Sequence, residues 1–160
     1  MPRLWPVALA PPDGALFVLL APTVKDRLER FLLIDPGALE AGGVLLGFRR
    51  DPHIEVLQAT LPSPYDVRGR YRFVRQSRSH QMEATSAWQA SGRTVDYVGE
   101  WHTHPEAHPS PSAIDRAELI RRSIEHRREP LIELIIGTDS LWSGMVIAGR
   151  CVPLIPLNAQ

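Results

Sequence analysis

The chain has 160 residues, of which 44% are hydrophobic and 22% are charged, a balance typical of a globular domain. This composition excludes a disordered, collagen-like or low-complexity protein. Eighteen basic residues balance eighteen acidic ones, so the net charge does not indicate a nucleic-acid partner. The single cysteine, Cys151, cannot form an internal disulfide, which fits a reducing compartment. We therefore expect one cytoplasmic domain over residues 1–160.

The amino-terminal segment predicts neither a signal peptide nor a membrane span. One positive charge, Arg3, precedes an apolar stretch, but prolines at 6, 11 and 12 interrupt that stretch before a helix of useful length can form. The longest uninterrupted apolar run, 15–21, is far shorter than a membrane-spanning helix. We expect no membrane association.

Periodicity and turn residues predict strands and helices in mixed order. In chain order we expect a strand at 15–20, a helix from 23 to about 35, strands at 42–48 and 54–60, an exposed loop at 61–69, a short strand at 71–74, a helix at 76–90, a strand at 94–104, a proline-rich loop at 105–111, a helix at 112–128, a hairpin of 131–136 and 142–147, and a possible strand at 151–155. This order predicts the mixed α/β class, with one mixed sheet packed by helices.

A pair of histidines, His102 and His104, lies at the end of the predicted strand 94–104. Residues two apart on a strand point to the same face, so both imidazoles can reach one metal ion. The pair alone is equally compatible with two exposed strand histidines, because two ligands do not make a metal site.

A carboxylate, Asp115, follows eleven residues after His104 and near the start of the predicted helix. Three protein ligands and one open position are the arrangement of catalytic zinc sites. Ser112 and Asp115 also have the spacing of a helix capping box, which is the simpler interpretation of these two residues alone. Both interpretations can hold, since a helix start also suits a carboxylate and presents a hydroxyl.

Another carboxylate, Glu40, lies two residues before the apolar strand 42–48. Taken alone, it is expected to be solvated, because glutamate is mostly exposed and is costly to bury without a partner.

Together these residues resemble the signature of the JAB/JAMM (MPN-plus) metallopeptidases. The resemblance combines Glu40, Gly47 seven residues later, the sequence His102-Thr103-His104-Pro105, and Ser112-x-x-Asp115 after six further residues. It extends from about 15 to 147, and the segment 99–106 is most similar to short bacterial JAB proteins of integrative elements and of antiphage operons built around cyclic-nucleotide synthases. The resemblance implies a curved mixed sheet flanked by helices, the deaminase-like JAB/MPN architecture.

Carried over by position, the resemblance implies that His102, His104 and Asp115 bind one zinc ion, that Glu40 transfers the proton, and that Ser112 stabilises the oxyanion. It implies an isopeptidase or peptidase that cleaves an amide after the carboxy-terminal tail of a ubiquitin-like or otherwise conjugated protein, with E1- and E2-like enzymes of the same operon as partners. The chemistry agrees, since zinc lowers the pKa of a bound water to about 7 and a neighbouring carboxylate can take the proton.

The other polar residues near the motif have simpler interpretations. Trp101 is expected in the core, while Glu100 shares the face of the histidines and is either a partner behind them or an unrelated strand residue. Cys151 is expected to be an ordinary thiol. The remaining histidines and a local basic run are expected to be solvated: His53, His80, His108 and His126, and Arg68, Arg70, Arg72, Arg75 and Arg78.

Two rival functions belong to other classes. A non-catalytic MPN scaffold would have no physical reason to keep a costly carboxylate beside three ligands. A metal hydrolase of small amides or nucleotides is less compatible, because zinc deaminases use cysteine ligands and the chain has no Cys-x-x-Cys.

Overall fold

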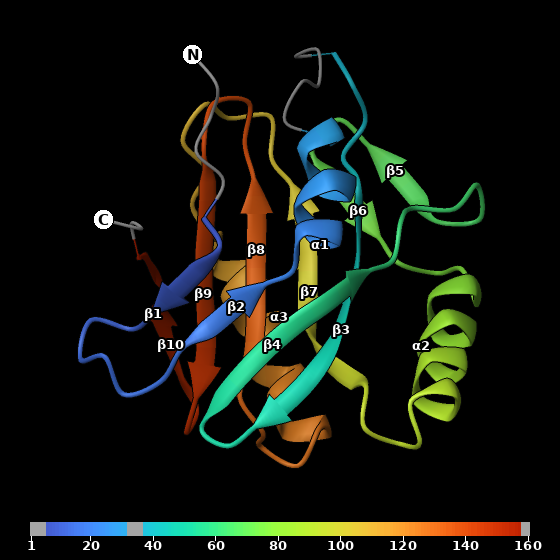
Figure 1. Cartoon of the computed structure of the whole chain (residues 1–160). Helices are drawn as coiled ribbons and strands as arrows, with labels where there is room; N and C mark the ends of the chain where they lie inside the picture. Colours follow the sequence, from blue (N-terminus) through green and yellow to red (C-terminus); the bar gives the residue numbers. More distant parts are fainter. Residues whose placement is uncertain (1–5, 32–36, 158–160) are drawn as a thin grey trace.

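A computed structural model of the chain describes residues 6–31 and 37–157, whose elements are labelled in Figure 1. The elements are β1 (Ala8–Ala10), β2 (Val18–Leu20), α1 (Pro22–Leu28), the 3-10 helix η1 (Glu29–Phe31), β3 (Gly42–Arg50), β4 (His53–Ala59), β5 (Val67–Gly69), β6 (Arg72–Val74), α2 (Ser79–Ala90), β7 (Asp96–Thr103), α3 (Ala113–Glu125), β8 (Leu131–Ile136), β9 (Leu141–Ile147), β10 (Arg150–Pro153) and β11 (Ile155–Pro156).

Within the described residues, nine strands form one sheet in the order β10-β9-β8-β7-β3-β4-β2-β1-β11. The pairs β2/β4 and β7/β8 are parallel and the other neighbouring pairs are antiparallel. The two edge strands, β10 and β11, are separated in the chain by Leu154 alone, so the sheet must curve until its edges approach each other. The predicted mixed α/β class and curved mixed sheet are confirmed.

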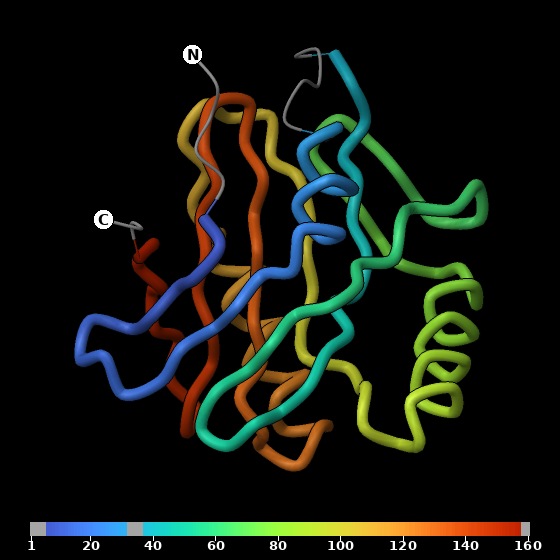
Figure 2. The backbone as a smooth tube through the Cα atoms, in the orientation of Figure 1, coloured from blue at the N-terminus to red at the C-terminus, as the bar shows by residue number. Residues whose placement is uncertain are grey.

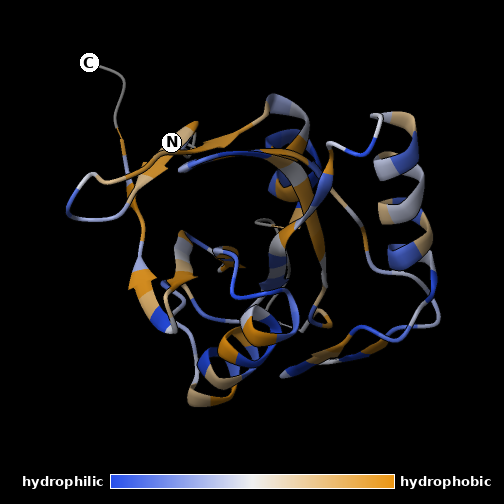
Figure 3. Cartoon of the chain, turned by 90° about the horizontal axis from the view of Figure 1, so that it is seen from below, coloured by the Kyte–Doolittle hydropathy of each residue, from blue (hydrophilic) through white to orange (hydrophobic). Residues whose placement is uncertain are grey.

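The helices cover the two faces of this sheet, with α1 in front and α3 behind in Figure 1. On the concave side, Val24 and Leu28 of α1 join the main core, which includes Trp101 of β7 as expected. On the other side, α3 packs through Leu119, and α2 lies against a small cluster around Val44. Figure 3 shows the hydrophobic stretches concentrated in the strands.

Most predicted elements are found, with shifted ends. The prediction of a loop at 61–69 is partly wrong, because Val67–Gly69 pairs with Arg72–Val74 as the two-stranded hairpin β5/β6. The predicted strand 15–20 is shortened to Val18–Leu20, and the expected end of the first helix near 35 lies outside the described residues. Strand β1 was not predicted, because the proline-rich sequence around it hides its alternation.

In the backbone trace of Figure 2, the start of β3 and the end of β7 lie in the same part of the fold, although they are distant in sequence. These strands are antiparallel, with Gly42 opposite His102 and Gly43 opposite Trp101. Residues that precede β3 therefore lie beside residues that follow His102. This register brings Glu40 to the histidine pair.

Candidate metal centre

The side chains of His102, His104 and Asp115 converge at the carboxyl end of β7. The Nε2 atoms of the two histidines are 3.0 Å apart. The carboxylate oxygens of Asp115 lie 3.5 Å from His102 Nε2 and 3.3 Å from His104 Nε2. Each residue offers one ligand atom, and these atoms all lie within 4.8 Å of one another. The structure thus brings together the three residues that the sequence pattern singled out.

The start of α3 fixes the position of Asp115. Ser112 Oγ accepts a hydrogen bond of 3.0 Å from the Asp115 amide, and the Ser112 amide donates one of 2.8 Å to Asp115 Oδ2. This is a complete capping box, so the helix start and the histidine contacts are compatible, as anticipated. Because Ser112 Oγ accepts one bond, its hydroxyl proton is still able to donate to another group.

Glu133 of β8 orients His102, and the sequence analysis missed it. Its Oε1 lies 2.8 Å from His102 Nδ1, the ring nitrogen that faces away from Asp115. The side chain is 5% exposed and lies in a strand whose six residues are all buried. A single acidic residue in the otherwise apolar sequence Leu-Ile-Glu-Leu-Ile-Ile was the available signal, since a buried carboxylate needs a partner.

Of the two interpretations left open for Glu100, the structure favours a strand residue unrelated to the histidine pair. Its carboxylate is bonded instead to Arg75, Arg122 and the Tyr97 hydroxyl. Glu100 lies opposite Glu133 in the β7/β8 register, and of these two carboxylates it is Glu133 that contacts His102 Nδ1. Strand alternation gave the correct face but could not say which of two adjacent carboxylates makes the contact.

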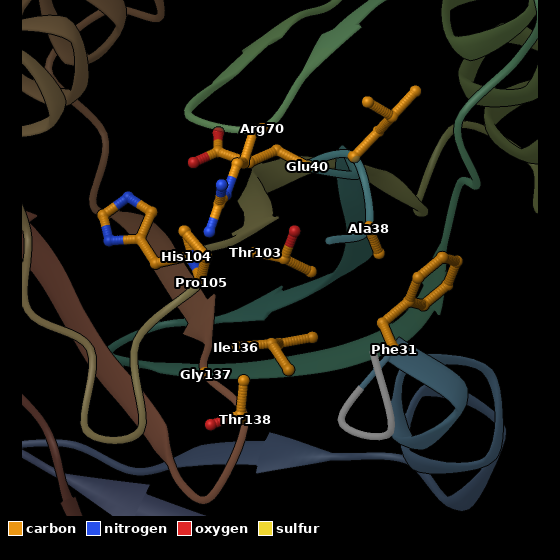
Figure 4. Close-up of a pocket in the computed structure, with 11 residues that line it drawn as sticks. Phe31, Ala38, Glu40, Arg70, Thr103, His104, Pro105, Ile136, Gly137 and Thr138 are labelled. Carbon is orange, nitrogen blue, oxygen red and sulfur yellow. The ribbon is translucent and has the colours of Figure 1, made fainter. Parts of the chain in front are cut away.

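Glu40 lies beside this cluster and is buried. The Ala41 amide donates to Thr103 Oγ1 at 2.9 Å and the Thr103 amide donates to the Ala41 carbonyl at 2.9 Å, which joins this segment to the residue between the two histidines. Only 8% of Glu40 is exposed, so the expectation of a solvated glutamate is wrong. Burial raises the pKa of Glu40, while the nearby His104 and His102 act to lower it. Figure 4 shows Glu40 and His104 on the wall of one cleft.

The charges of the cluster are strongly coupled. Burial acts to lower the pKa of His102, but its bonds to Asp115 and Glu133 outweigh burial and raise the pKa to about 10. Burial acts to raise the pKa of Asp115, and the two histidines overcome this and hold its pKa well below the ordinary range. A metal ion bound to His102 Nε2 would therefore have to displace a proton.

The match to a family profile decides the classification. Residues 36–149 match the profile described as prokaryotic homologs of the JAB domain. The chain belongs to the prokaryotic JAB family.

Relatives of this JAB protein carry informative names. A Pseudomonas aeruginosa protein named CD-NTase/cGAS isopeptidase is 42% identical over 76% of this chain and 80% of its own length. A Vibrio cholerae protein of the same name is 40% identical over 82% of this chain and 83% of its own length. A Sinorhizobium fredii protein named probable metalloprotease is 34% identical over 65% of this chain and 66% of its own length. These names support a JAB-type peptidase that acts on a protein substrate.

A solution structure of a protein from Desulfitobacterium hafniense has the same fold. It superposes with a TM-score of 0.59 at 21% identity and covers 86% of this chain and 88% of its own. Within the described part of the JAB chain, no helix has the length and apolar character needed to cross a bilayer.

The donor set of this JAB protein fits a zinc ion. Two imidazole nitrogens and a carboxylate are ligands that zinc accepts, and three protein ligands leave the open position of a catalytic site. The 3.0 Å approach of two ring nitrogens, with carboxylate oxygens on the same side, is an arrangement that a shared cation satisfies. Glu133 lies behind His102 in the position that a carboxylate takes behind a metal-bound histidine in such sites.

Among the other histidines, His80 differs most from its expected solvated state. It is 1% exposed and its ring nitrogens are bonded to Thr60 Oγ1 and Asp66 Oδ2 at 2.6 and 2.7 Å. This histidine belongs to the structural core and not to the metal cluster. His108 is exposed, as expected, and contacts Ser140 Oγ at 3.0 Å.

Proposed function

We propose that this protein is a zinc-dependent isopeptidase, with one zinc ion held by His102, His104 and Asp115. The observation that carries the proposal is the convergence of these three ligands with a buried carboxylate, Glu40, beside them. Zinc bound there would supply a Lewis acid that polarises the scissile carbonyl and activates a water. The names of the relatives, isopeptidase and metalloprotease, support the same chemistry.

Two residues of the chain are proposed to act on the reacting atoms. Glu40 accepts a proton from the attacking water as the water oxygen bonds to the amide carbon, and it then gives that proton to the leaving amine as the carbon–nitrogen bond breaks. The Ser112 hydroxyl donates to the carbonyl oxygen while negative charge develops on it. The products are a free carboxyl terminus and an amine.

The proposed substrate is a protein conjugated through an extended carboxy-terminal tail. Backbone pairing places an amide across the centre without many side-chain pockets, which suits a flexible tail. We place the tail in a groove edged by residues 61–69 and 105–111. A cleft lined by Glu40, His104 and Pro105, among others, opens beside the cluster (Figure 4). Pro105 belongs to the second of these edges, whereas none of the described residues 61–69 lines the cleft. If trimming the segment 61–69 left KM for a protein conjugate unchanged, the groove would lie elsewhere.

The cellular setting is part of the same proposal. We infer that the enzyme removes conjugates made by E1- and E2-like enzymes of its own operon, as part of bacterial antiphage defence in the cytoplasm, without a nucleic-acid or membrane partner. The relatives named CD-NTase/cGAS isopeptidase support a conjugated nucleotidyltransferase as the first substrate to test.

The decisive experiment compares the native chain with Glu40→Gln on such a conjugate, with released tails identified by mass spectrometry. This change keeps the shape of the side chain and removes the base, so cleavage should fall about 10²- to 10⁴-fold. Elemental analysis should give one zinc per chain in both proteins. Full zinc content after dialysis in His102→Ala or Asp115→Ala would refute the ligand assignment.

The same experiment separates catalysis from a scaffold role. A non-catalytic scaffold would bind the conjugate but release no tail, and Glu40→Gln would change nothing. Cleavage by Glu40→Gln at the native rate would remove Glu40 from the mechanism, and loss of zinc from this variant would make Glu40 a ligand or a structural support.

A further inference from the structure

The backbone of Glu40 is held by the β5/β6 hairpin. The Glu40 amide donates to the Gly69 carbonyl at 2.7 Å. Arg68 Nε donates to the Glu40 carbonyl at 2.8 Å, and Arg68 Nη2 donates to the Leu39 carbonyl at 3.3 Å. Both polar groups of the Glu40 backbone are therefore bonded to two consecutive residues of β5.

The hairpin itself is fixed at its base by a buried carboxylate. Asp66 immediately precedes β5 and accepts from the Ser63 amide at 2.8 Å, from the Gln76 and Ser77 amides at 2.9 and 2.8 Å, and contacts His80 at 2.7 Å. These bonds join the residues that precede β5 to the residues that follow β6. The hairpin is thereby tied to the body of the domain at its base and cannot move freely against it.

A second contact seats the hairpin on β3. A Cβ atom placed on Gly42 would lie 2.6 Å from the Phe73 ring, so the absence of a side chain at Gly42 makes room for Phe73 of β6. Glu40 is only two residues before Gly42. Ala41, which lies between them, donates its amide hydrogen to Thr103 Oγ1 of β7. The Glu40 segment is thus clamped between β7, which carries the histidines, and the hairpin.

From these contacts we propose that Arg68 is a positioning residue for Glu40. This inference rests on the proposed function, in which Glu40 transfers the proton. Arg68 spans two successive carbonyls, so it fixes the peptide on which the Glu40 side chain is carried. General acid/base catalysis needs the carboxylate within hydrogen-bonding distance of the proton that it moves, and a displacement of about 1 Å can cost about 10²-fold in rate.

The hairpin also offers a matched control. Arg72 of β6 lies opposite Gly69, is exposed, and has the same charge as Arg68. No bond from Arg72 to Leu39 or Glu40 is seen in the described part of the chain. Arg72→Ala therefore removes an arginine from the same hairpin without touching the Glu40 backbone.

The first test measures the backbone without any substrate. In the metal-free native protein, hydrogen exchange should show a protected Glu40 amide, because this amide is bonded to Gly69. Arg68→Ala should speed its exchange at least tenfold, whereas Arg72→Ala should leave it unchanged. Arg68→Lys, which keeps the charge but cannot span both carbonyls, should give an intermediate rate. Unchanged exchange in both Arg68 variants would overturn the proposal.

The second test is a double-mutant cycle on kcat with the zinc-loaded protein. Arg68→Ala should lower kcat roughly 10- to 100-fold with zinc content and KM close to native, and Arg72→Ala should not. If Arg68 acts only through Glu40, adding Arg68→Ala to Glu40→Gln should cost nothing further. An additive loss would show that Arg68 contacts the substrate directly and would refute positioning. Native activity in Glu40→Gln alone would remove Glu40 from the mechanism and with it the positioning role of Arg68, whereas failure of the native protein to cleave the conjugate would refute the proposed function.

Discussion

Replacing Glu133 by glutamine tests how the protein holds its metal. The Oε1 of Glu133 is 2.8 Å from His102 Nδ1 and the side chain is 5% exposed, so this bond sets the orientation of the ring in a dry environment. Glutamine has nearly the same shape and can still accept a hydrogen bond, but it carries no charge. The variant therefore removes the charge of the partner while retaining the packing of the buried strand.

The expected size of the effect follows from the behaviour of carboxylates behind metal-bound histidines. Loss of such a partner typically weakens metal affinity 10- to 100-fold. Each factor of ten is about 1.4 kcal/mol, so we expect Glu133→Gln to weaken zinc binding by about 1.4 to 2.7 kcal/mol. Competition against a chelator of known affinity, with zinc as the probe, measures this directly.

Glu100→Gln is the control. Glu100 lies opposite Glu133 in the sheet and is also a buried carboxylate, but its bonds go to Arg75, Arg122 and Tyr97. We expect this variant to lose stability in urea and to keep its zinc affinity within about twofold. Native affinity in Glu133→Gln, or equal weakening in both variants, would refute the role of Glu133 in orienting His102.

Further predictions concern the capping box, the base of the hairpin and the metal. Ser112→Ala should lower the cleavage rate about 10²-fold, because oxyanion stabilisation is lost. It should also lower the free energy of unfolding in urea by about 1 kcal/mol, because the cap on the Asp115 amide is lost. A native cleavage rate would exclude the first role, and a native unfolding free energy would exclude the second. The pKa of Asp66 is lowered, since its hydrogen bonds outweigh its burial, so its contribution to stability is complete above pH 3.8 and is lost as the pH falls through the folded-state pKa. Asp66→Asn should therefore be about 1 to 3 kcal/mol less stable at pH 7, and this gap to the native protein should narrow on acidification; a gap independent of pH would contradict the assignment. Removal of zinc with a chelator should lower the melting temperature reversibly, and a melting temperature unaffected by zinc would contradict binding to the folded state.

The sequence alone determined the ligand geometry within each element. His102 and His104 share a face because side chains on a strand alternate, and Ser112 and Asp115 meet because a capping box has a fixed spacing. These are local relations of two or three residues, and local backbone geometry is sufficient to predict them. The mixed strand and helix order likewise followed from periodicity and turn residues.

Only the tertiary structure decided which distant groups meet at the cluster. Glu40 is buried beside His104 because β3 and β7 pair with Gly42 opposite His102, a register that no local pattern encodes. Glu133, and not Glu100, reaches His102 because the neighbouring strand β8 runs parallel to β7 in a particular register. The hairpin that holds Glu40 depends on a buried Asp66 and His80, two polar residues that sequence reasoning placed in solvent or in a loop. Burial and strand pairing are properties of the assembled sheet, and they determine the surroundings of the residues that the sequence had already singled out.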